Sequence, residues 1–203
     1  MVNLQYLRDK LSQEQGKRKL LAVQAGKAMS DKEFKERNLE NILKARSIVQ
    51  IVAENTQKKI EFVVSNLVTT ALASVFSDPY KFELRFIQRR GKTEADLIFS
   101  KRGKETDDIL NAGGGGVADV ASTALRISFW SIKKNNHVMF LDEPGKFLHN
   151  PDYQQKFSDL LKEVSDKLGL QIIAISDQKE FLQSADKVIT VENNKGVACI
   201  KEN

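Results

Sequence analysis

The sequence predicts an α/β protein preceded by a helical arm, and three patterns predict this class. Residues 1–60 contain no proline and are dense in strong helix formers. Residues 81–99 alternate polar with apolar side chains around a turn, which is typical of an antiparallel hairpin. From residue 117 onward, short apolar strands alternate with helical segments, which indicates a mainly parallel sheet covered by helices on both sides.

Length and composition exclude several classes of protein. The chain has 203 residues, of which 41% are hydrophobic and 29% charged, so we expect one or two folded domains rather than a disordered chain. No apolar run approaches the roughly 20 residues of a membrane span, and the first residues lack the apolar core of a signal peptide, so we expect a cytoplasmic location and no membrane partner. Cys199 is the only cysteine, which excludes an internal disulfide. Since the chain has only two histidines as well, a zinc site is disfavoured.

The predicted arm covers residues 1–60 and is basic, whereas residues 61–203 form the predicted α/β domain. The arm holds 13 Lys and Arg against 7 Asp and Glu, and the rest of the chain holds 19 against 20. Ser30-Asp31-Lys32-Glu33 matches a capping box, which predicts a second helix start inside the arm. Two apolar stripes at helical spacing indicate either a hairpin of helices or a coiled-coil stub for another chain: Leu4, Leu7 and Leu11, then Ile42, Ala45, Val49 and Val52.

The helical pattern after residue 61 ends at Ser77-Asp78-Pro79, and strands follow it. Residues 81–87 and 95–99 form the predicted hairpin, with a turn at Arg89-Arg90-Gly91-Lys92. The tip is basic, so Arg89, Arg90 and Lys92 are weak candidates for contacts with DNA phosphates; a solvated charged surface is the commoner origin of such a run.

Beyond the hairpin, strands and helices alternate. Helices are predicted at residues 117–132, 152–168 and 179–184, and strands at residues 137–141, 170–175, 187–191 and 197–200. Asn193-Asn194-Lys195-Gly196 predicts a tight turn between the last two strands.

Four consecutive glycines, Gly113 to Gly116, stand directly before a predicted helix. Glycines there let backbone N–H groups approach a ligand closely, and a helix N-terminus favours an anion such as phosphate. A glycine run also suits a flexible linker, so this pattern alone leaves both interpretations open.

A second pattern places two adjacent carboxylates, Asp142 and Glu143, after the apolar strand at residues 137–141. Ligands of open α/β sheets bind at the carboxyl ends of the strands. One carboxylate there would hold the shell of a magnesium ion, and its neighbour would polarise a water aimed at phosphorus, which favours nucleotide chemistry over a surface turn.

In the order of these parts, the chain resembles the C-terminal lobe of an SMC-like ABC-type ATPase, the class of chromosome-maintenance and double-strand-break-repair ATPases. Short phage-encoded forms that contain only this lobe are the most similar. The resemblance spans Phe62 to Val191 and places the arm where the family has the returning strand of its coiled coil.

The resemblance implies roles for particular residues, with ATP and Mg²⁺ as the cofactors. Gly113, Gly114, Gly115 and Gly116 would form the signature loop, which in the family contacts the γ-phosphate of ATP held by the opposite lobe of a dimer. Asp142 would bind magnesium through water and Glu143 would act as the general base, both in the Walker B motif. Gly145 to Asn150 would be the D-loop, and Asp177 would stand at the position of the switch histidine.

The chain also departs from the family pattern. Gly113 replaces the usual serine of the signature motif, Asp177 replaces the switch histidine, and His149 replaces the usual D-loop aspartate. No G-x-x-x-x-G-K-[ST] string is present, because Gly91-Lys92-Thr93 lacks the upstream glycine. We therefore expect no ATP hydrolysis by this chain alone.

Two functions of different classes follow from these patterns. The first is the signature-loop and Walker B half of an SMC-like ATPase in DNA recombination, repair or replication, completed by a Walker A-bearing lobe of another chain or by self-association, with a nuclease subunit as a further partner. The alternative is a catalytically degenerate coiled-coil protein that binds DNA or assembles complexes.

Overall fold

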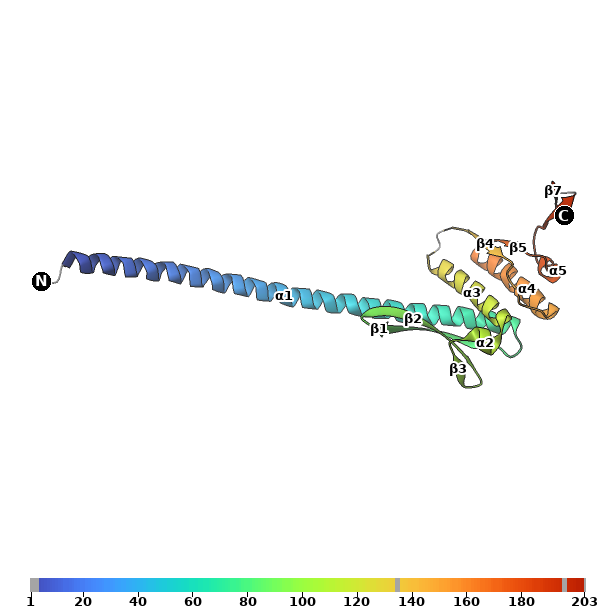
Figure 1. Ribbon diagram of the computed structural model, residues 1–203, viewed down its shortest axis with the longest axis horizontal. Coiled ribbons are helices and arrows are strands. Elements are labelled where there is room, and N and C mark those ends of the chain that lie inside the picture. Colours follow the sequence, from blue (N-terminus) through green and yellow to red (C-terminus); the bar gives the residue numbers. More distant parts are fainter. Residues whose placement is uncertain (1–3, 134–135, 195–196, 203) are drawn as a thin grey trace. The chain divides into compact units, whose positions relative to one another are not determined.

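The computed structural model describes residues 4–133, 136–194 and 197–202, and its elements appear in Figure 1. The chain divides into two compact units, Met1–Thr56 and Gln57–Asn203. The expected domain boundary after residue 60 stays a prediction, because compact units need not be separate domains.

A single helix, α1 (Leu4–Val75), runs through the whole predicted arm. The prediction of two helices in the arm is therefore wrong, and so is a fold-back hairpin of helices within it. Ser30 lies in the interior of α1 and begins no new helix. The residues around it are strong helix formers, and a serine inside a helix costs only a few tenths of a kcal/mol, so the capping-box pattern does not interrupt the helix.

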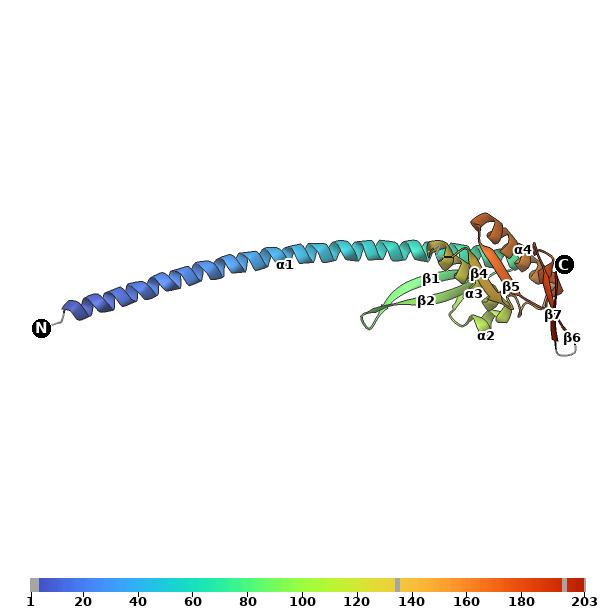
Figure 2. The ribbon, with the colours of Figure 1, turned by 90° about the horizontal axis from the view of Figure 1, so that it is seen from above.

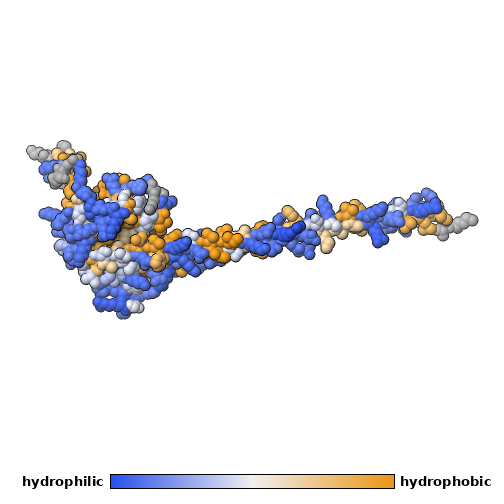
Figure 3. Space-filling view, turned by 180° about the vertical axis from the view of Figure 1, so that it is seen from behind, coloured by the Kyte–Doolittle hydropathy of each residue, from blue (hydrophilic) through white to orange (hydrophobic). Residues whose placement is uncertain are grey.

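All described residues of the first unit are exposed along α1, including its leucines, isoleucines and valines. Apolar groups alternate with hydrophilic stretches along this helix, as Figure 3 shows. Helices in proteins gain most of their stability from packing an apolar face against other elements, and no described residue of this unit has its apolar side chain buried in that way.

The second unit begins with the last turns of α1, which pack against a three-stranded antiparallel sheet. This sheet consists of β1 (Lys81–Arg89), β2 (Lys92–Lys101) and β3 (Lys104–Thr106) in the order β1-β2-β3. Arg89 pairs with Lys92, and the turn residues Arg90 and Gly91 have φ of 51° and 74°, which suits a two-residue hairpin turn. The predicted hairpin and its turn are confirmed; the third strand was not predicted.

Side chains of α1 satisfy the outer edge of β1. The Phe86 N–H donates to a Glu61 carboxylate oxygen at 2.5 Å, the Leu84 N–H to Ser65 Oγ at 2.9 Å, and the Phe82 N–H to Thr69 Oγ1 at 3.0 Å. Four residues of a helix advance about 6 Å and two residues of a strand about 6.6 Å, so the two spacings match. We call these three bonds the polar ladder.

The remaining elements follow the predicted alternation of helix and strand. They are α2 (Ile109–Gly113), α3 (Gly115–Lys133), β4 (Val138–Asp142), α4 (Pro151–Leu168), β5 (Gln171–Ile175), α5 (Lys179–Leu182), β6 (Ile189–Asn194) and β7 (Val197–Glu202). β4 and β5 are parallel, whereas β6 and β7 are antiparallel with Asn194 opposite Val197. The last hairpin is confirmed by this pairing, although residues 195 and 196 of its predicted turn lie outside the described residues.

The parallel sheet is covered on one face only. Met139, Leu141 and Ile172 belong to the hydrophobic core or pack against it, and α3 and α4 lie together on that side (Figures 1 and 2). Phe140 and Ile175 point the other way and are 72% and 66% exposed. The predicted α/β class is confirmed, but the prediction of helices on both faces is wrong, because no element among the described residues covers the second face.

One hydrophobic core joins α1 to the other elements of this unit. It combines the C-terminal turns of α1 with residues of the antiparallel sheet, α3, α4 and α5, and its fully buried side chains include Leu72, Phe82, Val120 and Phe157. No helix of the described chain is long and apolar enough to cross a membrane.

This core gives a stability test. Leu72 is 0% exposed, and Leu72→Ala should lower the free energy of unfolding by about 2–5 kcal/mol because the cavity left behind cannot collapse fully. Urea unfolding followed by the fluorescence of Trp130, the only tryptophan, measures the change. Leu67→Ala on the same helix removes an exposed side chain and should change the midpoint little; equal losses for the two variants would contradict this core.

Candidate functional site

The four glycines do not form one uniform loop. Gly113 ends α2, Gly114 links the two helices with φ of 82°, and Gly115 and Gly116 are the first residues of α3. The short helix α2 is fixed at its start by Asp108, whose carboxylate accepts a bond from the Asn111 N–H at 3.2 Å. The expected position of the glycines at a helix start is thus correct for Gly115 and Gly116.

Gly115 and Gly116 allow α3 to approach the segment that follows β4. A Cβ on Gly115 would lie 3.0 Å from the Phe147 side chain, and a Cβ on Gly116 would lie 3.0 Å from the Phe147 carbonyl oxygen and from Leu148. Gly113 is similarly close to the side chains of Ile109 and Tyr80. Internal packing therefore explains three of the glycines, whereas Gly114 borders open space.

Asp119 joins the same two segments by hydrogen bonding. Its half-buried carboxylate on α3 accepts a bond from the Phe147 N–H at 3.4 Å. Burial raises the pKa of Asp119, and bonds from the Phe147 and Gly145 N–H groups partly offset this rise. The glycines and Asp119 together fix Gly145–Leu148, most of the segment predicted to be a D-loop, against the start of α3.

The two predicted carboxylates stand at the carboxyl end of β4. Asp142 is the last residue of that strand, and Glu143 follows it with φ of 45°, in the left-handed region that glycine favours. The Glu143 N–H donates to the Ile175 carbonyl at 2.8 Å, which ties the ends of β4 and β5 together. Both carboxylates are exposed, as expected for groups that would meet a ligand.

Lys146 lies among the acidic side chains of this edge. Its ammonium group forms an ion pair with Glu143, and this hydrogen bond raises the pKa of Lys146, with smaller contributions from the charges of Glu143, Asp177 and Asp142. Asp177, which the resemblance places at the position of the switch histidine, is exposed just after β5. The structure thus brings Asp142, Glu143 and Asp177 to one sheet edge around a cation that sequence reasoning did not single out.

Gln178 connects this edge to the D-loop segment. Its side-chain Nε2 donates to the Gly145 carbonyl at 3.2 Å, and its backbone N–H donates to Ser176 Oγ at 3.2 Å. The Gln178 Oε1 atom is buried and has no hydrogen-bond partner among the described residues. A polar glutamine after an apolar strand was the available sequence signal, but only the fold shows what it contacts.

The described residues of the site do not form a complete set of metal ligands. Within the described ranges, no group of three or more His, Cys, Asp or Glu side chains is arranged to hold a metal ion. A magnesium ion that keeps most of its waters needs only one or two carboxylates, so Asp142 suits that weaker form of binding. The metal role of Asp142 stays a prediction.

The basic hairpin tip is partly neutralised. Arg89 pairs with Asp96 at 2.9 Å and with Glu94 at 3.2 Å, and these hydrogen bonds raise the pKa of the Arg89 guanidinium. Arg90 and Lys92 form no ion pair with any residue that the structure describes, and both are exposed. Of the three candidates for DNA contacts, these two retain uncompensated charge.

Comparison with known proteins gives a consistent result. No model of a protein family matches the sequence. The DNA double-strand break repair Rad50 ATPase of Archaeoglobus fulgidus is 27% identical over 158 residues, which cover 78% of this chain and 17% of that protein. The chain therefore spans less than a fifth of this relative.

Solved structures show the same architecture. A structure from work on ATP-driven dimerization and DNA-stimulated activation of SMC ATPases superposes with a TM-score of 0.56 at 19% identity, over 74% of this chain and 88% of that one. The Smc head domain with a coiled coil and joint from Pyrococcus yayanosii gives a TM-score of 0.56 at 18% identity, over 98% of this chain and 41% of that one.

These similarities show that the chain shares its fold with a lobe of the head domains of such ATPases. More narrowly, it has the fold of an SMC-like ABC-type ATPase lobe, and the expected resemblance is confirmed. The phage-encoded forms named in the expectation are not part of this finding.

The close contact between α3 and the D-loop segment predicts that a methyl group added at Gly116 destabilises the fold. Gly116→Ala should lower the free energy of unfolding by about 1–3 kcal/mol, because its Cβ meets a carbonyl oxygen and a buried leucine that cannot both move. Urea unfolding followed by Trp130 fluorescence checks this value. Gly16→Ala is the control, because no atom lies within 4 Å of a Cβ added at Gly16. If Gly116→Ala left the free energy of unfolding unchanged, the contact between Gly116 and the D-loop segment would be loose.

The raised pKa of Asp119 predicts a pH dependence. Because the folded-state pKa lies above the ordinary value of 3.8, the folded chain binds this proton more tightly than the unfolded chain. As pH falls from neutral to 3.8, the wild type should therefore gain stability relative to Asp119→Asn. Urea unfolding of both proteins across this range measures the difference, with exposed Asp9→Asn as the control; a constant difference would contradict the burial of the charge.

Proposed function

We propose that this chain is the signature-loop and Walker B half of an SMC-like ATPase that acts in DNA recombination, repair or replication, and that another polypeptide supplies the Walker A lobe. The similarity to Rad50 and to SMC heads supports the class. The division between two chains rests on an observation of the α/β unit itself, the uncovered face of its parallel sheet.

The parallel sheet supports this division because it is both narrow and half uncovered. It has two strands, β4 and β5, so each strand has one edge without a strand partner in the described part of the chain. Val138, Phe140, Ile173 and Ile175 are exposed on its outer face. Parallel sheets are stable with both faces covered, so further strands and a covering layer are expected from outside this chain.

The sequence lacks the element that the missing lobe would bring. No G-x-x-x-x-G-K-[ST] string is present, and Gly91-Lys92-Thr93 lies in the β1–β2 hairpin rather than between a strand and a helix. In the proposed pair, the partner grips the β- and γ-phosphates of ATP with that loop.

The residues of this chain have distinct roles in the proposed pair. ATP and Mg²⁺ supply the phosphoryl group and the charge that neutralises it. Asp142 would hold the magnesium ion through one of its waters, and Glu143 would accept a proton from the attacking water. Gly114, the one glycine of the run that borders open space, offers its backbone to the γ-phosphate.

Two features lower the catalytic power of this arrangement. Lys146 holds the Glu143 carboxylate, so Glu143 must leave this ion pair before it can act as a base. Asp177, at the position of the switch histidine, brings negative charge toward the phosphate. Slow turnover, or tight ATP binding with little hydrolysis, is consistent with both features.

A second candidate is a DNA-binding or assembly protein without catalysis, and one observation favours it. Arg90 and Lys92 keep uncompensated charge at an exposed hairpin tip. This candidate replaces the first if the affinity for DNA falls steeply with salt and ATP does not change that affinity, whether or not a partner protein is present. A nuclease subunit or a second copy of the chain would then be a partner in assembly only.

The first candidate predicts the outcome of one substitution. In the chain paired with a co-purifying protein that carries the Walker A string, Glu143→Gln should reduce ATP turnover by at least about 100-fold and retain ATP binding, since it removes the base but keeps the polar side chain. Turnover is measured by phosphate release and binding by calorimetry.

Glu163→Gln, an exposed change on α4, is the matched control and should leave turnover unchanged. Phe140→Asp should abolish the pairing itself, because it places a charge in the outer face of the sheet. Full turnover in the Glu143→Gln pair would remove Glu143 from the mechanism, and undiminished pairing by Phe140→Asp would remove the sheet face from the interface.

A further inference from the structure

The turn that follows β4 brings the side chains of Glu143 and Lys146 together. Pro144 and Gly145 stand at its centre, and Gly145 has φ of 80°. The Lys146 N–H donates to the Glu143 carbonyl at 3.2 Å. Proline followed by a residue of positive φ is typical of a type II turn, which places its first and fourth residues close together. The local sequence therefore produces the ion pair between the Lys146 ammonium and the Glu143 carboxylate.

Hydrogen bonds fix the backbone of this turn, whereas its two charged side chains reach solvent. The Glu143 N–H donates to the Ile175 carbonyl at 2.8 Å, and the Gly145 carbonyl accepts a bond from Gln178 Nε2 at 3.2 Å. The side chains of Lys146 and Glu143 are 57% and 44% exposed. A lysine carries its ammonium group on a flexible four-carbon stem, so Lys146 can change its partner without a movement of the backbone.

Three carboxylates lie near the Lys146 ammonium group. They belong to Glu143, Asp177 and Asp142, and the charges of all three act on Lys146. A triphosphate with one magnesium ion keeps a net negative charge, so a nucleotide at this sheet edge would meet like charges. Positive groups that contact the phosphates remove such repulsion, and lysine is a common phosphate ligand. Lys146 already lies where that positive charge is needed.

Lys146 also lies next to the start of α3. Its neighbour Phe147 packs against Gly115, where an added Cβ would lie 3.0 Å from the Phe147 side chain. Gly114, which borders open space, directly precedes Gly115. Gly114 and Lys146 thus flank the same contact from its two sides. An anion at the Gly114 backbone would therefore have Lys146 on the adjoining segment.

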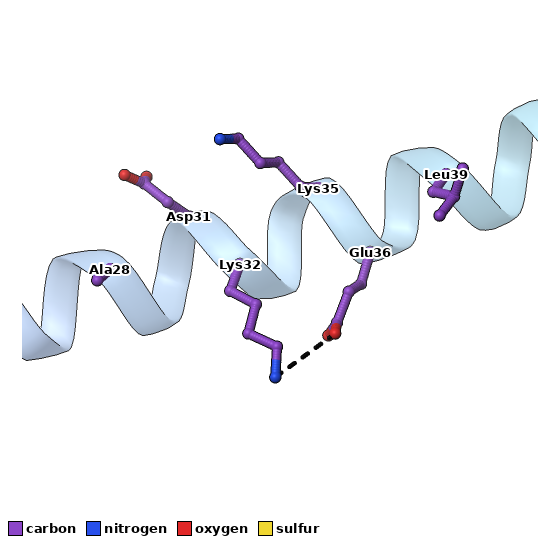
Figure 4. Close-up of a pocket in the computed structure, with 6 residues that line it drawn as sticks. All are labelled: Ala28, Asp31, Lys32, Lys35, Glu36 and Leu39. Atoms are coloured by element: carbon purple, nitrogen blue, oxygen red, sulfur yellow. Dashed lines mark ion pairs between the residues drawn. The ribbon is translucent and has the colours of Figure 1, made fainter.

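A shallow groove on α1 also carries lysines, but its side chains do not converge (Figure 4). Lys32 forms an ion pair with Glu36 at 3.6 Å, and Lys35 projects to another side of the same helix. The lining comes from this one helix: Ala28, Asp31, Lys32, Lys35, Glu36 and Leu39. A small-ligand site needs polar groups that converge on one point, and the groups around Lys146 come from three separate segments.

We infer that Lys146 leaves Glu143 to bind the terminal phosphate of ATP, so that one movement both neutralises the phosphate and frees the general base. This inference deepens the proposed function and rests on it. An exposed ion pair contributes little stability, whereas an ammonium group forms strong hydrogen bonds with phosphate, so the exchange favours the phosphate. Without nucleotide, Lys146 keeps the Glu143 carboxylate occupied. With nucleotide, Glu143 can accept a hydrogen bond from the attacking water instead.

The test measures nucleotide binding by the Glu143→Gln chain in the pair with a co-purifying protein that carries the Walker A string. In this background Lys146 has no carboxylate at residue 143 to neutralise, and hydrolysis does not interfere. Adding Lys146→Met should weaken the binding of ATP at least about tenfold and change the binding of ADP by less than about twofold, because ADP lacks the terminal phosphate. Calorimetry in the presence of Mg²⁺ measures both affinities.

Two further variants in the same background serve as controls. Lys146→Arg keeps the positive charge and should retain most of the affinity for ATP. Lys167→Met removes the same charge from an exposed position on α4, where the lysine is also paired with a glutamate of its own segment. It should leave the binding of both nucleotides unchanged. Circular dichroism should show equal helix content in all variants.

Two results would overturn the inference while the proposed function stands. If Lys146→Met leaves ATP binding by the Glu143→Gln pair unchanged, Lys146 only neutralises Glu143 and does not bind phosphate. If ATP and ADP lose affinity equally, Lys146 does not contact the terminal phosphate. By contrast, a Glu143→Gln pair that binds no ATP, or that keeps full turnover, contradicts the proposed function itself, and the inference then fails with it.

Discussion

The polar ladder between α1 and β1 is the contact on which the α/β unit depends. An edge strand exposes a row of N–H groups, and here Glu61, Ser65 and Thr69 accept the bonds of three of them. The same turns of α1 send Val68 and Leu72 into the core. One helix segment thus closes the antiparallel sheet with one face and supports α3 with another, so the glycines and the carboxylates keep their positions only while this segment is packed.

The glycine run shows that a sequence signal can have two causes. Before a helix, consecutive glycines indicate anion binding, but Gly115 and Gly116 are also needed because Phe147 and Leu148 lie against them. The two causes are connected, since a hydrogen bond from the Phe147 N–H to Asp119 joins α3 to the D-loop segment. A ligand at Gly114 would therefore lie beside the helix start that contacts the segment following Asp142 and Glu143.

The sequence predicted the elements of the α/β unit because local patterns determine them: the turn at Arg90-Gly91 and the strand that ends at Asp142 are set by neighbouring residues. Its errors concern tertiary contacts, which local patterns do not record. The apolar strands β4 and β5 predicted a sheet covered on both faces, since the sequence records that Phe140 is apolar but not whether this chain supplies its cover. Likewise, the capping-box pattern at Ser30 suggested a helix start, but the helix formers on both sides of Ser30 continue α1 through it. Lys146 and Gln178 were missed because their contacts depend on the tertiary fold.

The open edges of β4 and β5 have a consequence for the cell that makes this chain. Unpaired strand edges beside exposed apolar side chains act as templates for other strands, which is how sheets aggregate. Any copy synthesised in excess of whatever covers Phe140 and Ile175 presents that surface to chaperones and proteases. In the proposed pair, the steady amount of this chain would then follow the supply of the partner that covers this face of the sheet.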